Sequence, residues 1–287
     1  MLKNIFQIIP VPNEAPQVSY ALGDHPFILQ FKYLSSPDFV INQTRRTEQA
    51  TKYTRFLNVI SKSRVFKSPR YNTNFWALKT ADLDNWSSEW TQEGYILKNF
   101  ENEVKNFSEP GDLIKLTASD IYYNRGHVRS TSDFELPDDV EIMLDKIFSL
   151  DLEKYKKFEI ACTWFSQNQY LWPHSSSAAF IAIISSLESL MDKSGEKCKC
   201  CGQPKYSITK KFSKFLKDYV PDIDKMPYEE NLIYKTRSDL AHGADLFLSD
   251  LEPWGFFSGN QKINQDSLQR NTYQIVATAL LNWLKKN

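Results

Sequence analysis

The sequence predicts an α+β protein in which a β-rich region is followed by a helical region. Residues 1 to about 135 contain short β-branched or aromatic runs, which clusters of Pro, Asn, Asp and Gly separate. From Asp138 onward, nearly every segment has apolar residues at helical spacing and is long enough to be a helix. We therefore expect a β-rich, sandwich- or barrel-like domain over residues 1–137 and an all-α domain over residues 138–287.

The strands of the first region are predicted from residue type and from alternation. Phe27, Leu29 and Phe31 recur at every second position, which places them on one face of a strand over Pro26–Leu34. The further β-branched or aromatic runs are Tyr53 to Phe66, Asn74 to Lys79, Gly94 to Lys98 and Leu113 to Arg129. Together these runs indicate an antiparallel sandwich or barrel.

The helices of the second region are predicted from apolar residues three and four positions apart. The segment from about Ser175 to Asp192 is apolar almost all round, which indicates the buried centre of a helical bundle. The helices that we expect are, approximately, Asp151 to Tyr170, Ser175 to Asp192, Ser207 to Tyr219, Tyr228 to His242 and Ser267 to Lys286.

Composition limits the classes of function. The 287 residues carry 35 basic and 35 acidic side chains, so a nucleic-acid interaction would have to rest on local basic patches. The chain has no apolar run near the roughly 20 residues of a membrane span, and its first residues lack the pattern of a signal peptide. Three of the four cysteines fall within four positions, which is a poor disulfide framework. We therefore expect a cytoplasmic protein without a membrane span.

Glu188 is the single ionisable residue between Ser175 and Met191. A carboxylate among apolar neighbours is costly to bury without a partner, so it should meet a cation or take up a proton. Arg237 on a later helix is the natural partner, because a guanidinium suits carboxylate pairing. The alternative is that this edge of the helix is exposed and Glu188 meets water.

The stretch from Tyr234 to Gly243 places a guanidinium, a carboxylate and an imidazole within six residues, at Arg237, Asp239 and His242. The glycine is well placed to end the helix. On an ideal helix, Arg237 and His242 lie about 140° apart, so the two do not converge on one straight helix. A bent helix end, or a two-fold partner that supplies the matching pair, would bring such groups together. Arginine and histidine near a helix end are also ordinary capping residues.

The combination of Ser186-Leu187-Glu188-Ser189-Leu190 in one helix with Arg237-Ser238-Asp239-Leu240-Ala241-His242-Gly243 in a later one resembles the HEPN superfamily, and most of all its Apea-like branch. The mark of that family is an arginine, four to six residues and a histidine, and this chain has four intervening residues. The resemblance covers roughly residues 150 to 287.

The resemblance implies an all-α bundle that often forms a homodimer with the two motifs facing each other, and a metal-independent endoribonuclease. Arg237 and His242 would be the catalytic pair, with Asp239 and Glu188 as supporting residues. Such domains occur in bacterial antiviral defence and toxin systems, and the β-rich domain would then sense a target or a regulatory partner. Toxins paired with nucleotidyltransferase antitoxins carry a tyrosine two residues after the histidine, where this chain has Ala244. The alternative is a non-catalytic module for nucleotide or RNA binding or for dimerisation.

The cysteine cluster Cys198-Lys199-Cys200-Cys201-Gly202 contains C-x-x-C-G, a zinc knuckle that supplies half of a tetrahedral site. Cys200 could be a third ligand, and Cys162, His174 or a partner chain could give the fourth. The alternative is a loop with free thiols. The zinc would be structural, since the expected catalysis requires no cofactor.

Two basic patches are candidate RNA-binding surfaces. The predicted helix Ser207–Tyr219 carries lysines opposite its aromatic stripe, and these are also the ordinary charges of a solvated face. The segment from Tyr122 to Arg129 would, as a strand, project an aromatic ring and two guanidinium groups from one face. The candidate RNA-binding residues are Lys210, Lys211 and Lys214 in the helix and Arg125, His127 and Arg129 in the strand.

Overall fold

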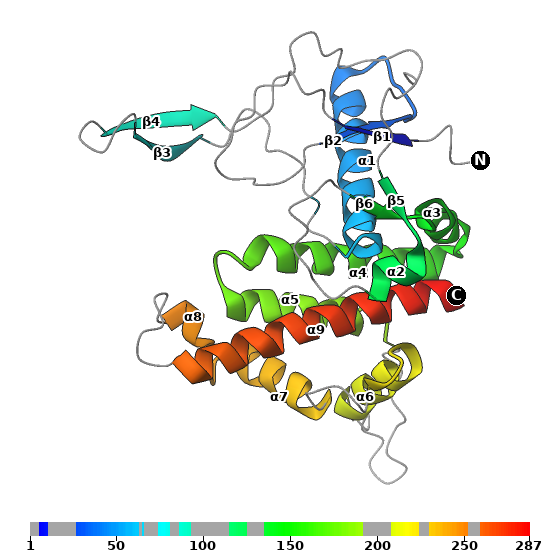
Figure 1. Cartoon of the computed structure of the whole chain (residues 1–287). Helices are drawn as coiled ribbons and strands as arrows, with labels where there is room; N and C mark the ends of the chain where they lie inside the picture. The colour runs from blue at the N-terminus through cyan, green and yellow to red at the C-terminus, as the bar shows by residue number, and fades with distance from the viewer. Residues whose placement is uncertain are drawn as a thin grey trace, which may run out of the picture. The chain divides into compact units, whose positions relative to one another are not determined.

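The computed structural model describes residues 6–10, 27–62, 65, 74–80, 86–92, 115–124, 135–191, 208–223, 230–251 and 259–287 (Figure 1). The chain divides into two compact units. The N-terminal unit comprises Met1–Thr51 and Phe66–Asp139, and the helical unit comprises Lys52–Val65 and Val140–Asn287. Helix α1, Phe39–Ile60, contributes its last residues to the helical unit.

The described strands of the N-terminal unit form three separate two-stranded pairings. The strands are β1 Phe6–Pro10, β2 Phe27–Phe31, β3 Asn74–Thr80, β4 Trp86–Gln92, β5 Lys115–Thr117 and β6 Glu135–Pro137. β1 pairs with β2 and β3 pairs with β4 in antiparallel register, whereas β5 and β6 are parallel. The short helix α2, Ser119–Asn124, follows β5.

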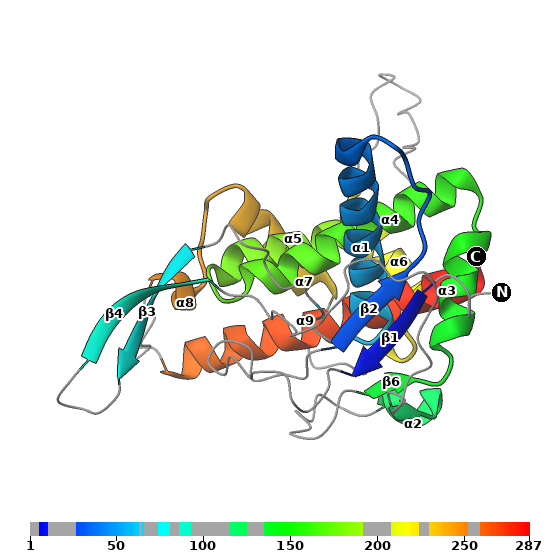
Figure 2. The ribbon, with the colours of Figure 1, turned by 90° about the horizontal axis from the view of Figure 1, so that it is seen from above.

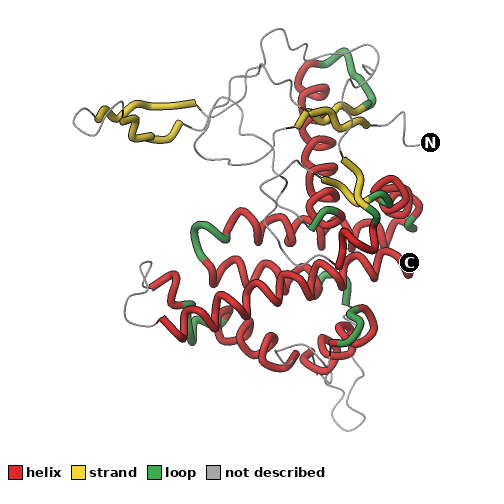
Figure 3. The backbone as a smooth tube through the Cα atoms, in the orientation of Figure 1, coloured by secondary structure: helices red, strands yellow, loops and turns green. Residues whose placement is uncertain are grey.

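The expected sandwich or barrel is wrong for the described residues, which are mostly helical (Figure 3). The predicted strand from Tyr53 to Phe66 is largely the end of α1. In the predicted strand from Leu113 to Arg129, the described part contains only the short β5, and α2 follows it. The strand predictions at β2 and β3 are confirmed, and Gly94 to Lys98 lies outside the described residues.

The end of α1 was misread because residue type was weighed above spacing. Its buried side chains include Tyr53, Phe56, Leu57 and Ile60. Steps of three, four and seven residues from Tyr53 place these side chains on one helical face, whereas a strand would need steps of two. Aromatic and β-branched residues favour strands only weakly, so burial of this face decided the structure.

The helical unit contains seven further described helices. They are α3 Val140–Ser149, α4 Leu152–Leu171, α5 Ser176–Glu188, α6 Ile208–Tyr219, α7 Glu230–Ala241, α8 Leu248–Leu251 and α9 Gly259–Lys286. The five helices predicted for this region correspond to α4, α5, α6, α7 and α9, although α9 begins earlier than expected. No helix in the described ranges is long and apolar enough to cross a membrane.

α5 and α9 form the centre of the helical unit. Figures 1 and 2 show α4 and α5 side by side, and α5 and α9 lie between α4 and the α6–α7 pair. The Phe158 ring of α4 stacks on Trp283 of α9, with centroids 5.7 Å apart and an angle of 6°. Phe212 of α6 contacts Tyr234 of α7 at 5.1 Å. The prediction that the helix from about Ser175 to Asp192 is central is therefore confirmed by α5.

Candidate functional site

Helix α7 turns Arg237 toward α5. Ile233 and Tyr234 are buried, with 1% and 7% of their surface exposed. Arg237 lies four and three positions after them, on the same helical face, and 23% of its side chain is exposed. The apolar face that packs α7 against the bundle thus carries one guanidinium with it.

Glu188, the last residue of α5, receives that guanidinium. Nη2 of Arg237 lies 2.8 Å from Oε2 of Glu188, and the hydroxyl of Tyr234 donates to Oε1 at 3.1 Å. Burial raises the pKa of Tyr234, and the Glu188 carboxylate raises it further, so the phenol stays a donor. The predicted pairing of Glu188 with Arg237 is confirmed. A catalytic role for either residue stays a prediction.

Most N–H donors of the Arg237 guanidinium have no hydrogen bond to the residues that the structure describes. A guanidinium carries five N–H donors, and Nη2 makes the hydrogen bond recorded for Arg237 among the described residues. Nε is buried and has no hydrogen-bond partner there. The central carbon of the guanidinium lies 6.0 Å from the centroid of the Tyr234 ring, at the limit of a cation–π contact. The guanidinium is therefore paired with Glu188 and has further N–H donors without a hydrogen bond to the described residues.

His242 is the residue that caps α7 at its C-terminus, and its side chain is exposed. The amide of Gly243 donates to the Leu240 carbonyl at 3.2 Å, and the amide of Ala244 donates to that of Asp239 at 2.9 Å. This pair of bonds is a Schellman motif, which requires a left-handed residue after the cap. Gly243 supplies it with φ of +70°. The predicted helix end at this glycine is confirmed.

The structure does not bring Arg237 and His242 into contact. Arg237 faces α5, whereas the His242 imidazole has no recorded hydrogen bond to the described residues. Asp239 is half-buried and takes part in the cap through its backbone carbonyl. A complete site would therefore need groups from outside this one helix end.

Sequence reasoning missed a second carboxylate, which binds the other end of α5. Asp250 of α8 accepts hydrogen bonds from the Ser175 hydroxyl at 3.0 Å, the Ser176 amide at 2.7 Å and the Ser177 amide at 2.9 Å. Burial raises the pKa of Asp250, but the hydrogen bonds from these serines lower it more, and the net shift is downward. The Ser175–Ser177 run before an apolar helix signals an N-cap, but nothing in the sequence points to Asp250 as its partner.

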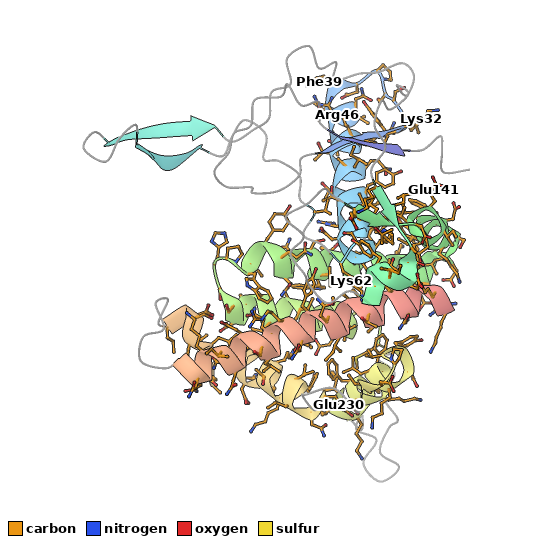
Figure 4. The ribbon with its side chains drawn as sticks, viewed as in Figure 1. Lys32, Phe39, Arg46, Lys62, Glu141 and Glu230 are labelled. Carbon is orange, nitrogen blue, oxygen red and sulfur yellow. The ribbon has the colours of Figure 1, made fainter. Side chains whose placement is uncertain are left out.

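Two of the three candidate RNA-binding lysines of α6 lie opposite its buried aromatic residues, as expected, and the third does not. Lys210 and Lys214 are exposed and Lys211 is half-buried, while Phe212 and Phe215 are buried. The α6–α7 contact is polar at one end, near the labelled Glu230 in Figure 4. There Ser213 donates to the Glu230 carboxylate at 2.7 Å and Lys217 lies 3.4 Å from it. The Ser213 hydrogen bond, with help from Lys217, lowers the pKa of Glu230.

Several predicted site residues lie outside the described residues. They are Arg125, His127 and Arg129 of the expected RNA-binding strand, and Cys198, Cys200 and Cys201 of the expected zinc knuckle. Of the two further zinc ligands considered, His174 is exposed, whereas Cys162 is fully buried and burial raises its thiol pKa well above the usual range. The described ranges contain no group of three or more His, Cys, Asp or Glu side chains that could hold a metal.

Lys62 is a further titratable group that the sequence did not single out, and Figure 4 labels it at the end of α1. Its ammonium donates to the Thr278 hydroxyl of α9 at 3.0 Å. Burial, together with the charge of Lys285, lowers the pKa of Lys62 to about 8. The lysine thus joins two helices of the core and is no part of the α7 site.

Comparisons of the chain with protein-family models, with curated proteins and with solved structures return no match. The resemblance to the HEPN superfamily therefore stays a prediction from the residues that carry it. The contact of Glu188 with Arg237 and the exposed position of His242 provide the basis for a functional proposal.

Proposed function

We propose that the helical unit is a metal-independent endoribonuclease of the HEPN type, in which Arg237 and His242 act on RNA. The observation that carries the proposal is the Glu188–Arg237 pair, 2.8 Å long, which holds a guanidinium on the helix that ends at an exposed histidine. Glu188 and Tyr234 orient the arginine. Asp239 supports the helix end at which His242 lies.

These residue types suit cleavage of a phosphodiester by the neighbouring ribose hydroxyl. The 2′-oxygen bonds to the phosphorus and the bond to the 5′-oxygen breaks, which leaves a 2′,3′-cyclic phosphate and a 5′-hydroxyl. The His242 imidazole accepts the 2′-hydroxyl proton, and the departing 5′-oxygen takes up a proton from water. Arg237 stabilises the charge that builds up on the phosphoryl oxygens. Nη2 binds Glu188 and Nε is buried, so the remaining Nη N–H groups would be the donors for that contact.

The divergence of Arg237 and His242 within one chain favours a site built from two copies. In a homodimer whose α7 ends face each other, the arginine of one copy and the histidine of the other would meet on one phosphate. The exposed lysines of α6, Lys210 and Lys214, would hold the RNA backbone beside that site. A bacterial defence or toxin setting, with the N-terminal unit as sensor of a trigger or partner, follows by family analogy alone.

Incubation of the full chain with end-labelled RNA in EDTA tests the proposal. We expect cleavage with cyclic phosphate ends, and a loss of about 10²- to 10⁴-fold in rate for His242→Ala, because general base catalysis contributes about that much. His174→Ala is the matched control, since His174 is also exposed but lies on the α4–α5 turn. The same oligonucleotide in 2′-deoxy form should stay intact. Cleavage that persists in His242→Ala would contradict the proposed role of the imidazole.

A second candidate, a non-catalytic RNA-binding or dimerisation module, is favoured by one observation: Arg237 engages Glu188 and not His242. This function predicts that wild-type protein binds labelled RNA and leaves it intact. Fluorescence anisotropy against salt concentration measures the binding. Lys210→Ala with Lys214→Ala should lower the salt slope by about 0.7 for each lost phosphate contact with single-stranded RNA.

A further inference from the structure

The segment that follows α7 is fixed on α5 and α9 by three residues, which we call the α8 anchor: Phe247 and Asp250 bind α5, and Leu248 binds α9. The Asp250 carboxylate accepts hydrogen bonds from two backbone amides and one hydroxyl at the N-terminus of α5, with donor–acceptor distances of 2.7 to 3.0 Å. Charge-assisted hydrogen bonds of this kind are about twice as strong as neutral ones. The positive end of the α5 dipole adds to them.

The other two residues of the anchor prevent the segment from turning about Asp250. The Phe247 amide donates to the Ser177 hydroxyl at 2.8 Å, and its ring meets Phe180 edge-on at 5.3 Å. Phe247 is 3% exposed, so its contact with Phe180 is shielded from solvent. The Leu248 amide donates to the Gln265 side chain of α9 at 2.8 Å.

α5 thus holds the chain from Arg237 to Asp250 at two points. Glu188 at its C-terminal end binds Arg237, and the serines at its N-terminal end bind Asp250. The helix has 13 residues, or about 20 Å between the two points. His242 and the exposed residues 243–246 lie in the chain between them. Both ends of that stretch are set by one rigid element.

We propose that Asp250 is a positioning residue, which sets the place of the His242 imidazole relative to Arg237 by fixing the exit of α7 on α5. The inference rests on the proposed function in one respect, because it assigns His242 the role described above. Release of Asp250 would leave the Arg237 contact intact and free the other end of the stretch. Misplacement of a catalytic group by about 1 Å can cost about 10²-fold in rate.

The test compares Asp250→Asn with Asp245→Asn in the full chain. Asp245 is an exposed acid of the same segment whose carboxylate accepts the next amide, that of Leu246, at 2.8 Å. Hydrogen exchange of amides 243–248 and the proton resonances of the His242 imidazole are measured in both variants, whether or not the protein cuts RNA. The four histidines of the chain are few enough to assign by single replacements.

In Asp250→Asn we expect roughly tenfold faster exchange over 243–248, since one anchored end is lost, together with shifted His242 resonances. Asp245→Asn should leave both at wild-type values. Asp250→Glu keeps a carboxylate and should restore part of the protection. In the cleavage assay, kcat should fall by about 10²-fold with KM little changed, and melting curves of the variant show whether it is folded.

The proposal is overturned if exchange rises at Ser176 and Ser177 alone, because the anchor would then have no effect on the α7 exit. It is equally overturned if Asp250→Asn and Asp245→Asn give the same exchange rates and the same His242 resonances. If Asp250→Asn does not fold, Ser175→Ala removes one of the three donors and is judged by the same readouts. If wild-type protein cuts no RNA, the proposed function fails, whereas the exchange and imidazole measurements still decide the role of Asp250.

Discussion

The two ends of α5 hold a carboxylate each, and they do so by different chemistry. At the N-terminal end, Asp250 binds backbone amides that the helix leaves unpaired. At the C-terminal end, Glu188 lies where the helix offers carbonyl groups and the negative end of its dipole. A carboxylate there needs an external cation, and Arg237 supplies it. A helix therefore binds an acid at its N-terminus through its own amides. An acid at its C-terminus needs a basic side chain from another element.

The largest expected effect follows from removal of the cation. Arg237→Ala leaves Glu188 half-buried at the unfavourable end of the dipole, and we expect a loss of about 2–3 kcal/mol in the free energy of unfolding. The double variant Arg237→Ala, Glu188→Gln removes the unpaired charge as well, and should be more stable than the single variant. Urea unfolding of both, with Glu188→Gln alone, completes a double-mutant cycle.

A cycle in which the two substitutions simply add would show that the pair contributes nothing to stability. The contrast between the ends of α5 would then lie in geometry alone. Tyr234→Phe provides a matched control on the same carboxylate, because it removes the hydroxyl that donates to Oε1 and leaves the ion pair in place. We expect it to cost about 1 kcal/mol.

At the N-terminal end of α5, the contribution of Asp250 to the free energy of unfolding should depend on pH. Its loss should cost less than the loss of Arg237. Asp250→Asn is expected to cost about 1–2 kcal/mol at pH 7, as for loss of an N-cap acid. The native pKa of Asp250 is lowered by its hydrogen bonds from the serines, so its contribution is present above the unfolded pKa of about 3.9. It is lost as the pH falls through the lower native pKa, because the unfolded chain then binds the extra proton.

Unfolding in urea at pH 7 and at successively lower pH measures this difference. The gap between wild type and Asp250→Asn should shrink in acid, below the unfolded pKa of about 3.9. A gap that stays constant over that range would mean that the charge of Asp250 does not matter. The shape of the side chain would then explain its effect.

The same contrast explains what the sequence could and could not predict. The Glu188–Arg237 pair was predictable, because one ionisable residue in an apolar helix demands a partner and α7 offers a suitable one. The Asp250 contact was not, because its partners are backbone amides 73 and 74 positions away and any acid could have filled the place. The helix end at Gly243 was predictable from local chemistry alone.

At the level of the fold, long segments with helical spacing were predicted correctly. Predictions that relied on residue type alone were wrong at the end of α1. α5 and α9 bury one or more whole faces, and this pattern is visible as apolar residues at helical spacing. The end of α1 has the same spacing, but its aromatic and β-branched content suggested a strand. Short pairings such as β5 with β6 involve three residues each, too few to produce any period.

The smallest effect that we predict lies between the two ends of α5, at the cap of α7. Gly243 has φ of +70°, and a Cβ added there would meet no atom within 4 Å. The cost of Gly243→Ala is therefore backbone strain alone. That strain is about 1 kcal/mol, and Gly243→Asn should cost less, because asparagine tolerates the left-handed region. Gly259→Ala is the matched control, since Gly259 has the same open surroundings and no positive φ. Thermal unfolding measures the three variants. An alanine at 243 that costs no more than one at 259 would mean that the Schellman cap does not set the end of α7, and that the Arg237 and Asp250 contacts alone hold His242 in place.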